Sequence, residues 1–461
     1  MEKINPAALI QDAKFNKFHL GLASLSFLLI VFDGYDVAIY GAITPTLMDE
    51  WGIDAVKAGT IGSAGLFGML IGAFIFGTLA DKLGRRRIIL LTVGLYSFFT
   101  ALCGFAQEPL FFTVCRFIAG MGLGGVMPNV IALLSDFSPK KHVATITTFV
   151  LTGFAVGGLL APVLGIFIIP NFGWEWSVWI AAFPLALLPW IAKTTPESFA
   201  ILEKKGRQTE IAAQVRRILK DSLPSPDHVF IVEERSKNAL PISDLFSERR
   251  GASTILFWVA FFCHLMLAYG ILNWLPKIMM EAGFSLTSSL TFLAFWQIGG
   301  IVGTILAGRL ADKFGAKSIV ISLYAIGVLV IIGVGLSKSV VLTFALVALA
   351  GGTITGVQNL VQVYISQFYP PFARATALGS ASSIGRLGAM VGPILGGMLL
   401  TRSFSSEAIF FSFAIPGIFA ALAILLVKNN RGYHVTSASP RGTDLSKPAK
   451  ESAPSIKVSR D

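Results

Sequence analysis

The chain has 461 residues, of which 54% are hydrophobic and 14% charged, and its mean hydropathy is +0.72. Soluble domains carry about 25% charged residues, and no soluble core can hide this much apolar surface, so a soluble protein, a disordered chain and a collagen-like chain are all excluded. The net charge of +11 does not indicate nucleic-acid binding, because the charges fall in short clusters between apolar stretches, as in the cytoplasmic loops of a membrane protein.

Apolar stretches long enough to cross a membrane follow one another along most of the chain. A span needs about 20 mainly apolar residues to cross the hydrocarbon core. The sequence predicts about twelve, near residues 18–42, 56–80, 88–106, 110–134, 143–169, 175–193, 252–275, 285–311, 318–337, 340–366, 375–401 and 407–427. The expected fold is therefore an all-α, polytopic membrane protein with six transmembrane helices followed by six.

A polar, basic stretch divides these spans. The expected organisation is an N-terminal six-helix half at 1–193, a cytoplasmic linker loop at 194–250, a C-terminal six-helix half at 251–427 and a cytoplasmic tail at 428–461. The tail is polar, basic and rich in Ser and Pro, a composition typical of disorder.

Basic residues are concentrated on one set of loops. The loops after the second, fourth and eighth spans carry Lys82, Arg85, Arg86, Arg87, Lys140, Lys141, Lys313 and Lys317. The opposite set carries little beyond Lys57, Lys277, Lys338 and Arg402. Because cytoplasmic loops carry the excess of Lys and Arg, both termini and the linker are expected on the cytoplasmic side.

The two sets of six spans repeat one another at a fixed offset. Pro45 and Pro276 lie 231 residues apart (276 − 45 = 231), and the same offset joins Met48 to Met279, Gly77 to Gly308, Asp81 to Asp312, Gly84 to Gly315, Pro139 to Pro370 and Pro162 to Pro393. So many identities at one register indicate two repeats of the same topology, related by a pseudo-twofold axis along the membrane normal. That symmetry predicts a site near the midplane, between the halves, that opens alternately to each side.

Three motifs resemble a known superfamily. The segment Gly77-Thr-Leu-Ala-Asp-Lys-Leu-Gly-Arg-Arg-Arg87 is similar to the signature loop of the major facilitator superfamily, and Gly308-Arg-Leu-Ala-Asp-Lys-Phe-Gly315 is a weaker copy without the paired arginines. Arg116-Phe-Ile-Ala-Gly120 resembles the fourth-helix motif of the superfamily. Asp33-Gly-Tyr-Asp36, followed by Ile39-Tyr-Gly41, resembles the signature of the aromatic acid:proton symporters, which carry benzoate, hydroxybenzoates and related ring acids.

The resemblance covers nearly the whole chain except the linker and the tail. It implies a proton-coupled secondary transporter, not an enzyme, that resides in the bacterial cytoplasmic membrane and imports a small aromatic carboxylate such as benzoate or a hydroxybenzoate. The implied partners are the acid, protons and the lipid bilayer, with no nucleic acid, and the chain is expected to work as a monomer. No cofactor is expected beyond the coupling protons. No metal is expected either, since the three cysteines lie inside apolar stretches.

Other functions remain open at this point. An exporter of drugs or metabolites, or a carrier of another small organic anion, has the same signature loop, which does not distinguish import from export. A membrane enzyme or a channel is disfavoured, because the sequence has no histidine-rich metal cluster, nucleophile elbow or phosphate loop and because the repeat favours a carrier over a pore. Intramembrane carboxylates together with a membrane arginine favour uptake of an anion.

Asp33 and Asp36 are the candidates for proton coupling. They lie one turn apart in the first span and can face the same side of the helix. A carboxylate at this depth costs a few kcal/mol, so it is expected to face a cavity or a partner. Either at least one of them binds and releases the coupling proton, or they pair with Arg116 and hold two helices together.

Two arginines inside the spans are candidates for binding the substrate carboxylate. Arg386 lies eleven residues into the eleventh span, and the sequence has no acidic residue inside spans seven to twelve apart from Asp312 and Glu407 at their ends. It is predicted to bind the substrate anion or, alternatively, to reach across the halves to Asp33 or Asp36. Arg116 is expected at the depth of Asp36, where its forked guanidinium suits a carboxylate from the protein or from the substrate.

Two further sets complete the predicted site. Tyr35, Asn129, Gln297 and Asn359 are candidates for contact with the ring or its hydroxyl groups, with core packing as the alternative for the aromatic side chain. The residues of the two loop copies are expected to gate the transporter: Gly77, Asp81, Gly84, Arg85 and Arg86, with Gly308, Asp312 and Gly315.

The loop copies have a mechanical interpretation. Gly77 permits close helix packing, Gly84 permits a tight turn, and Asp81 caps a helix or pairs with the arginines. The resemblance implies that this polar latch forms in the outward-open state and breaks in the inward-open state. The alternative is that the basic residues only set topology.

Overall fold

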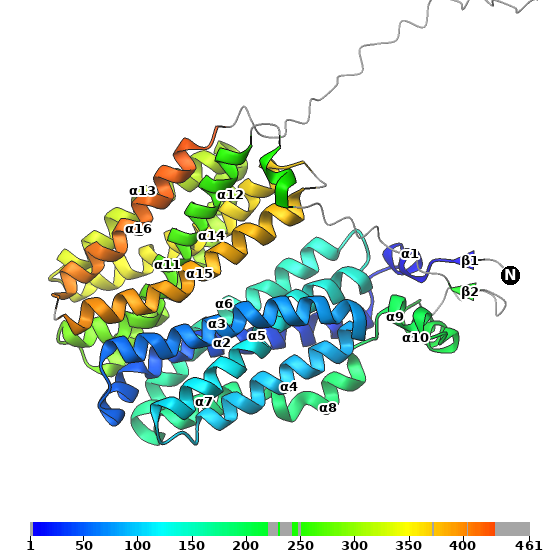
Figure 1. Ribbon diagram of the computed structural model, residues 1–461, viewed down its shortest axis with the longest axis horizontal. Coiled ribbons are helices and arrows are strands. Elements are labelled where there is room, and N and C mark those ends of the chain that lie inside the picture. The colour runs from blue at the N-terminus through cyan, green and yellow to red at the C-terminus, as the bar shows by residue number, and fades with distance from the viewer. Residues whose placement is uncertain are drawn as a thin grey trace, which may run out of the picture.

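The computed structural model describes residues 3–219, 229–230, 242–247, 250–370, 373–402 and 404–428. Within these ranges it has 12 spans that are long and apolar enough to cross a membrane. They form two helical bundles, one from each half of the chain (Figure 1). The expected all-α fold is therefore confirmed. The prediction of a disordered tail at 428–461 falls, from residue 429 onward, outside the described residues.

The N-terminal bundle contains α2 (Lys17–Trp51), α3 (Ala55–Leu83), α4 (Arg85–Cys103), α5 (Pro109–Phe137), α6 (Val143–Phe172), α7 (Trp174–Ala181) and α8 (Pro184–Thr194). The C-terminal bundle contains α11 (Gly251–Glu281), α12 (Leu286–Phe314), α13 (Ala316–Leu336), α14 (Val340–Phe368), α15 (Arg374–Thr401) and α16 (Ser406–Leu426). Shifted by 231 residues, the bounds of α3 and α5 coincide with those of α12 and α14. The internal repeat is thus a repeat of structure.

Three spans differ from the sequence prediction at prolines. The first and seventh were expected to end near residues 42 and 275, but α2 continues through Pro45 and α11 continues through Pro276. Membrane helices tolerate proline, because neighbouring helices satisfy the backbone groups that it frees. The sixth span was expected as one helix at 175–193 and is instead divided into α7 and α8 just before Pro184, which has no backbone N–H to donate.

The buried apolar residues show where the two bundles are packed together. One core is shared by both bundles and includes Ile43 and Leu47 of α2 with Ile278 of α11 and Leu290 of α12. Two further cores each contain buried residues of one half only. Accordingly, the bundles meet at the end far from the N-terminus and diverge toward the end where the N-terminus lies (Figure 1).

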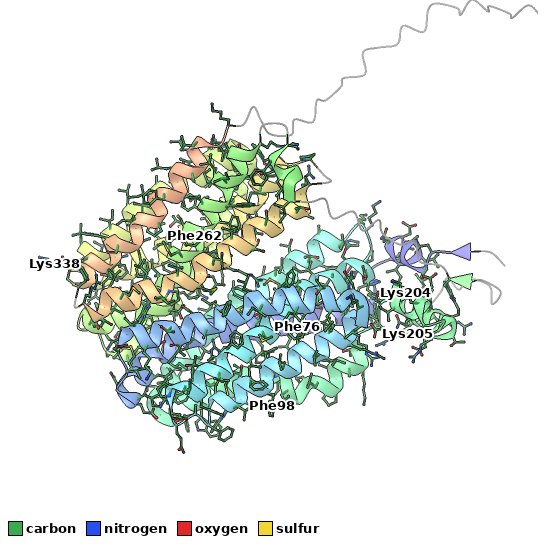
Figure 2. The ribbon with its side chains drawn as sticks, viewed as in Figure 1. Phe76, Phe98, Lys204, Lys205, Phe262 and Lys338 are labelled. Atoms are coloured by element: carbon green, nitrogen blue, oxygen red, sulfur yellow. The ribbon has the colours of Figure 1, made fainter. Side chains whose placement is uncertain are left out.

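The stretch 194–250, expected as a loop, contains regular structure next to the N-terminal bundle. Its helices are α9 (Phe199–Lys204) and α10 (Gln208–Leu219), and the shorter elements β1 (Lys3–Ile4), α1 (Pro6–Gln11) and β2 (Val229–Phe230) lie nearby. The 3-10 helix η1 (Ile242–Phe246) instead packs against α11 and α15 of the C-terminal bundle. Phe199 and Ile211 join the core of the N-terminal bundle. Lys204 and Lys205 lie at the end that carries the N-terminus, and Lys338 lies at the opposite end (Figure 2).

Candidate functional site

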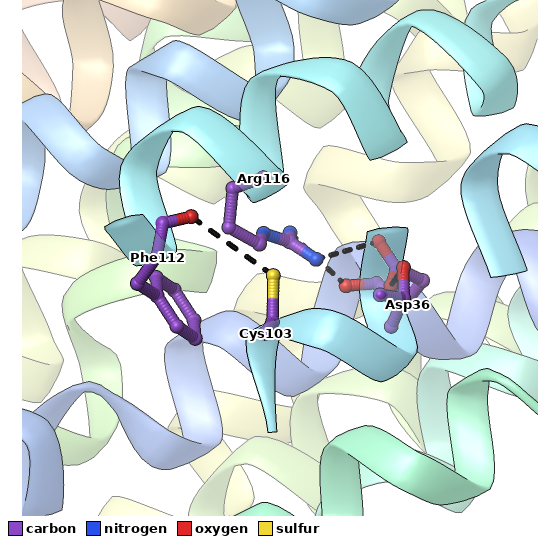
Figure 3. A network of polar contacts seen from close by, with 5 residues as sticks. Asp36, Cys103, Phe112 and Arg116 are labelled. Carbon is purple, nitrogen blue, oxygen red and sulfur yellow. Dashed lines mark hydrogen bonds and ion pairs between the residues drawn. The ribbon is translucent and has the colours of Figure 1, made fainter. Parts of the chain in front are cut away.

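An ion pair between Asp36 and Arg116 joins α2 to α5 inside the N-terminal bundle (Figure 3). Arg116 Nη1 donates a hydrogen bond to Asp36 Oδ2 at 2.8 Å, and Thr100 Oγ1 of α4 donates to Asp36 Oδ1 at 3.2 Å. The guanidinium also lies over the ring of Tyr40, 5.7 Å from its centroid. Both partners are buried, and each carboxylate oxygen of Asp36 has a donor. The pairing with Arg116, one of the two alternatives for these aspartates, is therefore present for Asp36.

Asp33 is buried one turn away without such a partner. It is 1% exposed, and its Oδ1 makes no hydrogen bond with any described residue. Asp36 and Arg386 are the charged groups near enough to act on it electrostatically. The hydroxyl of Tyr96 in α4, which interacts with Asp33, also lacks a hydrogen-bond partner within the described ranges. A buried polar atom without a partner is rare in native structures and calls for an explanation, which makes Asp33 a candidate for a functional role.

A small pocket lies beside this ion pair, between the two halves. Its wall is formed by Asp36, Val37 and Tyr40 of α2, Gly62, Gly65, Leu66 and Met69 of α3, Arg116, Gly120 and Leu123 of α5, and Tyr269 and Asn273 of α11. Gly65 and Gly120 face each other so closely that a Cβ at Gly120 would collide with the carbonyl of Gly65. The pocket is therefore framed by rigid backbone on one side and by aromatic rings on the other.

Arg386 of α15 reaches across the interface between the halves. Its Nη1 donates a hydrogen bond to the backbone carbonyl of Met69, a residue of the pocket wall, at 2.8 Å. No ion pair with Arg386 occurs among the residues that the structure describes, so the direct contact with Asp33 or Asp36, given above as the alternative to substrate binding, is not made in this state. Arg386 also acts electrostatically on Tyr269. A backbone carbonyl carries no full charge, so within the described residues the guanidinium of Arg386 has a hydrogen bond but no ion pair.

The remaining predicted contacts lie outside this pocket. Tyr35 points toward α7, where its hydroxyl donates to the carbonyl of Ser177 at 3.0 Å. Asn129 donates to the backbone carbonyl of Gly125, one turn earlier in α5, at 2.7 Å. None of Tyr35, Asn129, Gln297 and Asn359 lines the pocket. Their assignment to substrate contact is not supported in this conformation.

Gln297 and Asn359 belong to the C-terminal bundle. The amide of Gln297 in α12 lies against Gly158 of α6, across the interface between the halves. Asn359 of α14 is exposed and donates to Thr304 Oγ1 at 3.4 Å. Gln297 thus lies at the interface between the halves, whereas Asn359 is exposed.

Only some of the contacts predicted for the first loop copy are present. Gly84 has φ of +104°, a conformation that suits glycine, and ends α3 directly before α4 begins. Arg85 forms an ion pair with Asp136 at the end of α5, and Arg86 donates to the carbonyl of Ala192. Asp81 is exposed and has no hydrogen bond or ion pair with any described residue. The predicted pairing of Asp81 with the arginines is thus absent in this state.

The second copy has the same features. Asp312 is exposed, and Gly315 has φ of +85° between α12 and α13. Neither Gly77 nor Gly308 has a non-neighbouring atom within 4 Å of the position of a Cβ. The close packing expected at Gly77 is therefore absent, because the bundles are apart at this end.

Tyr269 is the pocket residue that sequence reasoning missed. It interacts with both Arg386 and Asp33, from opposite halves of the chain. It stands in an apolar run without a motif, so its position depends on how the halves pack. No group of three or more His, Cys, Asp or Glu side chains suited to a metal occurs within the described residues.

Comparisons with known proteins agree with this fold. The family model of the Major Facilitator Superfamily matches residues 26–385 and 318–457. Among solved structures, the xylose transporter XylE from E. coli gives a TM-score of 0.70 at 15% identity, covering 89% of this chain and 96% of that one. A bacterial homolog of the human lysosomal transporter Spinster gives a TM-score of 0.70 at 15% identity, covering 92% of this chain and 100% of that one.

Curated relatives match almost from end to end. The chain is 39% identical to the benzoate transport protein of Acinetobacter baylyi, over 95% of this chain and 96% of that protein. It is 33% identical to the gentisate transporter of Corynebacterium glutamicum, over 90% of this chain and 89% of that protein. It is 31% identical to the 4-hydroxybenzoate transporter of Acinetobacter baylyi, over 92% of this chain and 94% of that protein. The chain therefore belongs to the Major Facilitator Superfamily, in its family of aromatic acid:proton symporters, and is a multi-pass membrane transporter rather than an enzyme.

Proposed function

We propose that this protein imports a small aromatic carboxylate, of the size of benzoate or a hydroxybenzoate, together with protons across the bacterial cytoplasmic membrane. The observation that carries the proposal is Arg386, which has no ion pair within the described residues and lies beside a pocket lined by Tyr40 and Tyr269, with Asp33 nearby. The named activities of the benzoate, gentisate and 4-hydroxybenzoate relatives support the same substrate class.

Arg386 suits the substrate carboxylate better than Arg116 does. Arg116 already has a carboxylate in Asp36, and a buried ion pair is expensive to break. Arg386 instead donates to a carbonyl, which an anion can displace in exchange for charge-assisted bonds that are about twice as strong. In this proposal the acid binds Arg386 with its carboxylate and packs its ring between Tyr40 and Tyr269.

Asp33 is the better candidate for the coupling proton. Both oxygens of Asp36 have donors, so a proton added there would disrupt the ion pair with Arg116. The Oδ1 of Asp33 has no donor to lose. Its neighbour Arg386 couples the two events, because an acid bound to Arg386 reduces the positive potential at Asp33 and so favours protonation.

Alternating access follows from the two bundles. The basic residues Lys82 at the end of α3, Arg85 at the start of α4 and Lys141 just before α6 lie at the end that carries the N-terminus, so the positive-inside rule supports a cytoplasmic orientation for that end. The conformation is then inward-open, with the shared core closing the outer side. The unpaired Asp81 and the empty space at Gly77 are the features expected of a latch that has opened.

The proposal is tested with purified protein and a set of ligands. A thermal-shift screen would compare benzoate, hydroxybenzoates and protocatechuate with the non-aromatic acid muconate and with sugars. Ring acids are expected to raise the melting temperature, and counterflow of labelled benzoate in proteoliposomes is expected to identify a carrier. Stabilisation by sugars alone, or outward transport of uncharged drugs against a proton gradient, would contradict it.

A further inference from the structure

His264 is a buried residue of α11 for which the mechanism above has no use. Its side chain is 2% exposed, and neither Nδ1 nor Nε2 makes a hydrogen bond of normal geometry with a described residue. A neutral imidazole carries one donor and one acceptor. Burying such groups without partners costs free energy, so a histidine that merely fills the core is expected to be hydrogen-bonded.

The internal repeat gives His264 a counterpart. At the offset of 231 residues, His264 corresponds to Asp33 (264 − 231 = 33). The two residues occupy the same position in α2 and α11, the first long helix of each bundle. Each is nearly inaccessible, can bind a proton, and has a buried polar atom without a hydrogen bond from the described chain.

A tyrosine accompanies each of them. The ring of Tyr324 in α13 lies 5.7 Å from that of His264 at 73°, and Tyr96 of α4 lies within electrostatic range of Asp33. α4 and α13 are equivalent helices of the repeat, and the two tyrosines differ by one turn within it (324 − 231 = 93). Both hydroxyls are buried and unpaired among the described residues. The two halves therefore share one arrangement, an ionisable side chain on the first helix beside a tyrosine on the third.

The other neighbours of His264 are uncharged. Gln358 of α14 approaches the imidazole, and Cys263 precedes it in α11. On the side of α15, Gly385 packs against Phe261 of α11, and the adjacent Arg386 acts on Asp33 and Tyr269 rather than on His264. No described charged group pairs with His264 in this conformation, and Gln358 is its polar neighbour.

We propose that His264 is a second proton-binding residue of the transport cycle, an inference that rests on the proton coupling proposed above. A proton from the outer solution forms an N–H bond at the free ring nitrogen while the acid is loaded. That N–H bond breaks on the cytoplasmic side, and the proton leaves to the solution there. Tyr324 and Gln358 supply oxygen acceptors for the protonated ring.

Two protons then move with each molecule of the acid, one bound to Asp33 and one bound to His264. Two protons moving with a monoanion transfer one net positive charge, so the membrane potential drives uptake. At zero pH gradient, the accumulation ratio of the acid should rise about tenfold for each 59 mV of inside-negative potential. With one proton per monoanion, the potential has no effect, although a pH gradient still drives uptake.

The test measures benzoate accumulation by the full chain in proteoliposomes, with a potassium diffusion potential and a pH gradient imposed separately. Wild type should respond to both. His264→Gln, and His264→Asn as a second neutral variant, should lose the response to potential and keep the response to the pH gradient. Counterflow without either gradient checks that each variant is folded. His19→Gln is the control, since His19 is also buried with an unpaired Nε2 but lies at the end of α2.

The possible outcomes distinguish the role of His264 from proton coupling itself. A wild type that responds only to the pH gradient overturns the role of His264 and leaves proton coupling intact, and this result needs no variant. A folded His264→Gln protein that keeps the full response to potential also overturns it. A wild type that accumulates benzoate in response to neither gradient contradicts the proton coupling itself.

Discussion

The guanidinium of Arg116 lies 2.8 Å from Oδ2 of Asp36, and this contact separates two aspartates that the sequence presents as a pair. Asp36 is neutralised by Arg116 and receives a second hydrogen bond from Thr100. Asp33, one turn earlier, receives none from the described chain. We therefore expect the two aspartates to differ in role: Asp36 holds α2 against α5, and Asp33 binds the proton.

Asp33→Asn should uncouple transport from protons. The amide resembles the protonated carboxyl only, so the variant is expected to exchange substrate across the membrane without concentrating it. Counterflow and gradient-driven uptake of benzoate in proteoliposomes separate the two activities. Normal accumulation by this variant in an imposed pH gradient would exclude Asp33 as the coupling site.

Asp36→Asn should instead lower stability. Removing one partner of a buried ion pair leaves the other charge uncompensated and typically costs about 3–5 kcal/mol. Its melting temperature in detergent should fall clearly below those of wild type and Asp33→Asn. Glu210→Gln is the matched control, because the exposed Arg207–Glu210 pair is expected to contribute about 0–1 kcal/mol. Equal melting temperatures for Asp36→Asn and this control would show that the buried pair is not structural.

Gly34→Ala should disturb the contact between α2 and α6. A Cβ at Gly34 would collide with the backbone carbonyl of Phe154, which cannot move without its helix. Overpacking of this kind typically costs about 1–3 kcal/mol. Gly21→Ala, in the same helix with open space at its Cβ, should be neutral or slightly stabilising. Thermal unfolding of the two variants compares them directly, and equal stability would contradict the close approach.

Asp81→Ala should slow transport more than it weakens substrate binding. Asp81 is exposed and unpaired in this conformation, so its removal leaves this state intact and destabilises only the state in which the bundles close at that end. Turnover in proteoliposomes should fall while the dissociation constant for benzoate stays near that of wild type. A matching loss of affinity would indicate misfolding or a contact with the substrate.

The sequence predicted the spans and the repeat, and it offered the Asp36–Arg116 pair as one of two alternatives, but partly on wrong depths. The span predicted at 18–42 ends six residues after Asp36 (42 − 36 = 6), whereas α2 extends fifteen residues beyond it, to Trp51 (51 − 36 = 15). Hydropathy locates an apolar stretch, but it does not reveal how far a helix continues through Pro45 when its neighbours satisfy the backbone.

Two physical causes place predicted contact residues outside the pocket in this conformation. Each residue of a helix is rotated by about 100° from the next, so Tyr35 points to α7 while Asp36 faces the pocket. Inside a membrane an amide such as Asn129 finds a backbone carbonyl one turn away, which no motif reveals. Tyr269 enters the site through packing between halves, and a sequence pattern within one half does not encode that packing.

The central claim is that Arg386 binds the carboxylate of an aromatic acid, and the most direct test compares the affinities for benzoate and for its uncharged amide. A guanidinium gives a carboxylate two parallel charge-assisted bonds, which a lysine cannot reproduce. Truncating a buried charged partner typically costs about 2–5 kcal/mol.

Wild type should strongly prefer the acid. Arg386→Ala should weaken acid binding by about tens- to thousands-fold and lose most of the preference for the acid. Arg386→Lys should keep only part of the wild-type affinity. Arg402→Ala, an exposed arginine at the end of α15, serves as the control and should behave as wild type. A folded Arg386→Ala protein that keeps the full preference for benzoate over benzamide would contradict the assignment and move it to Arg116.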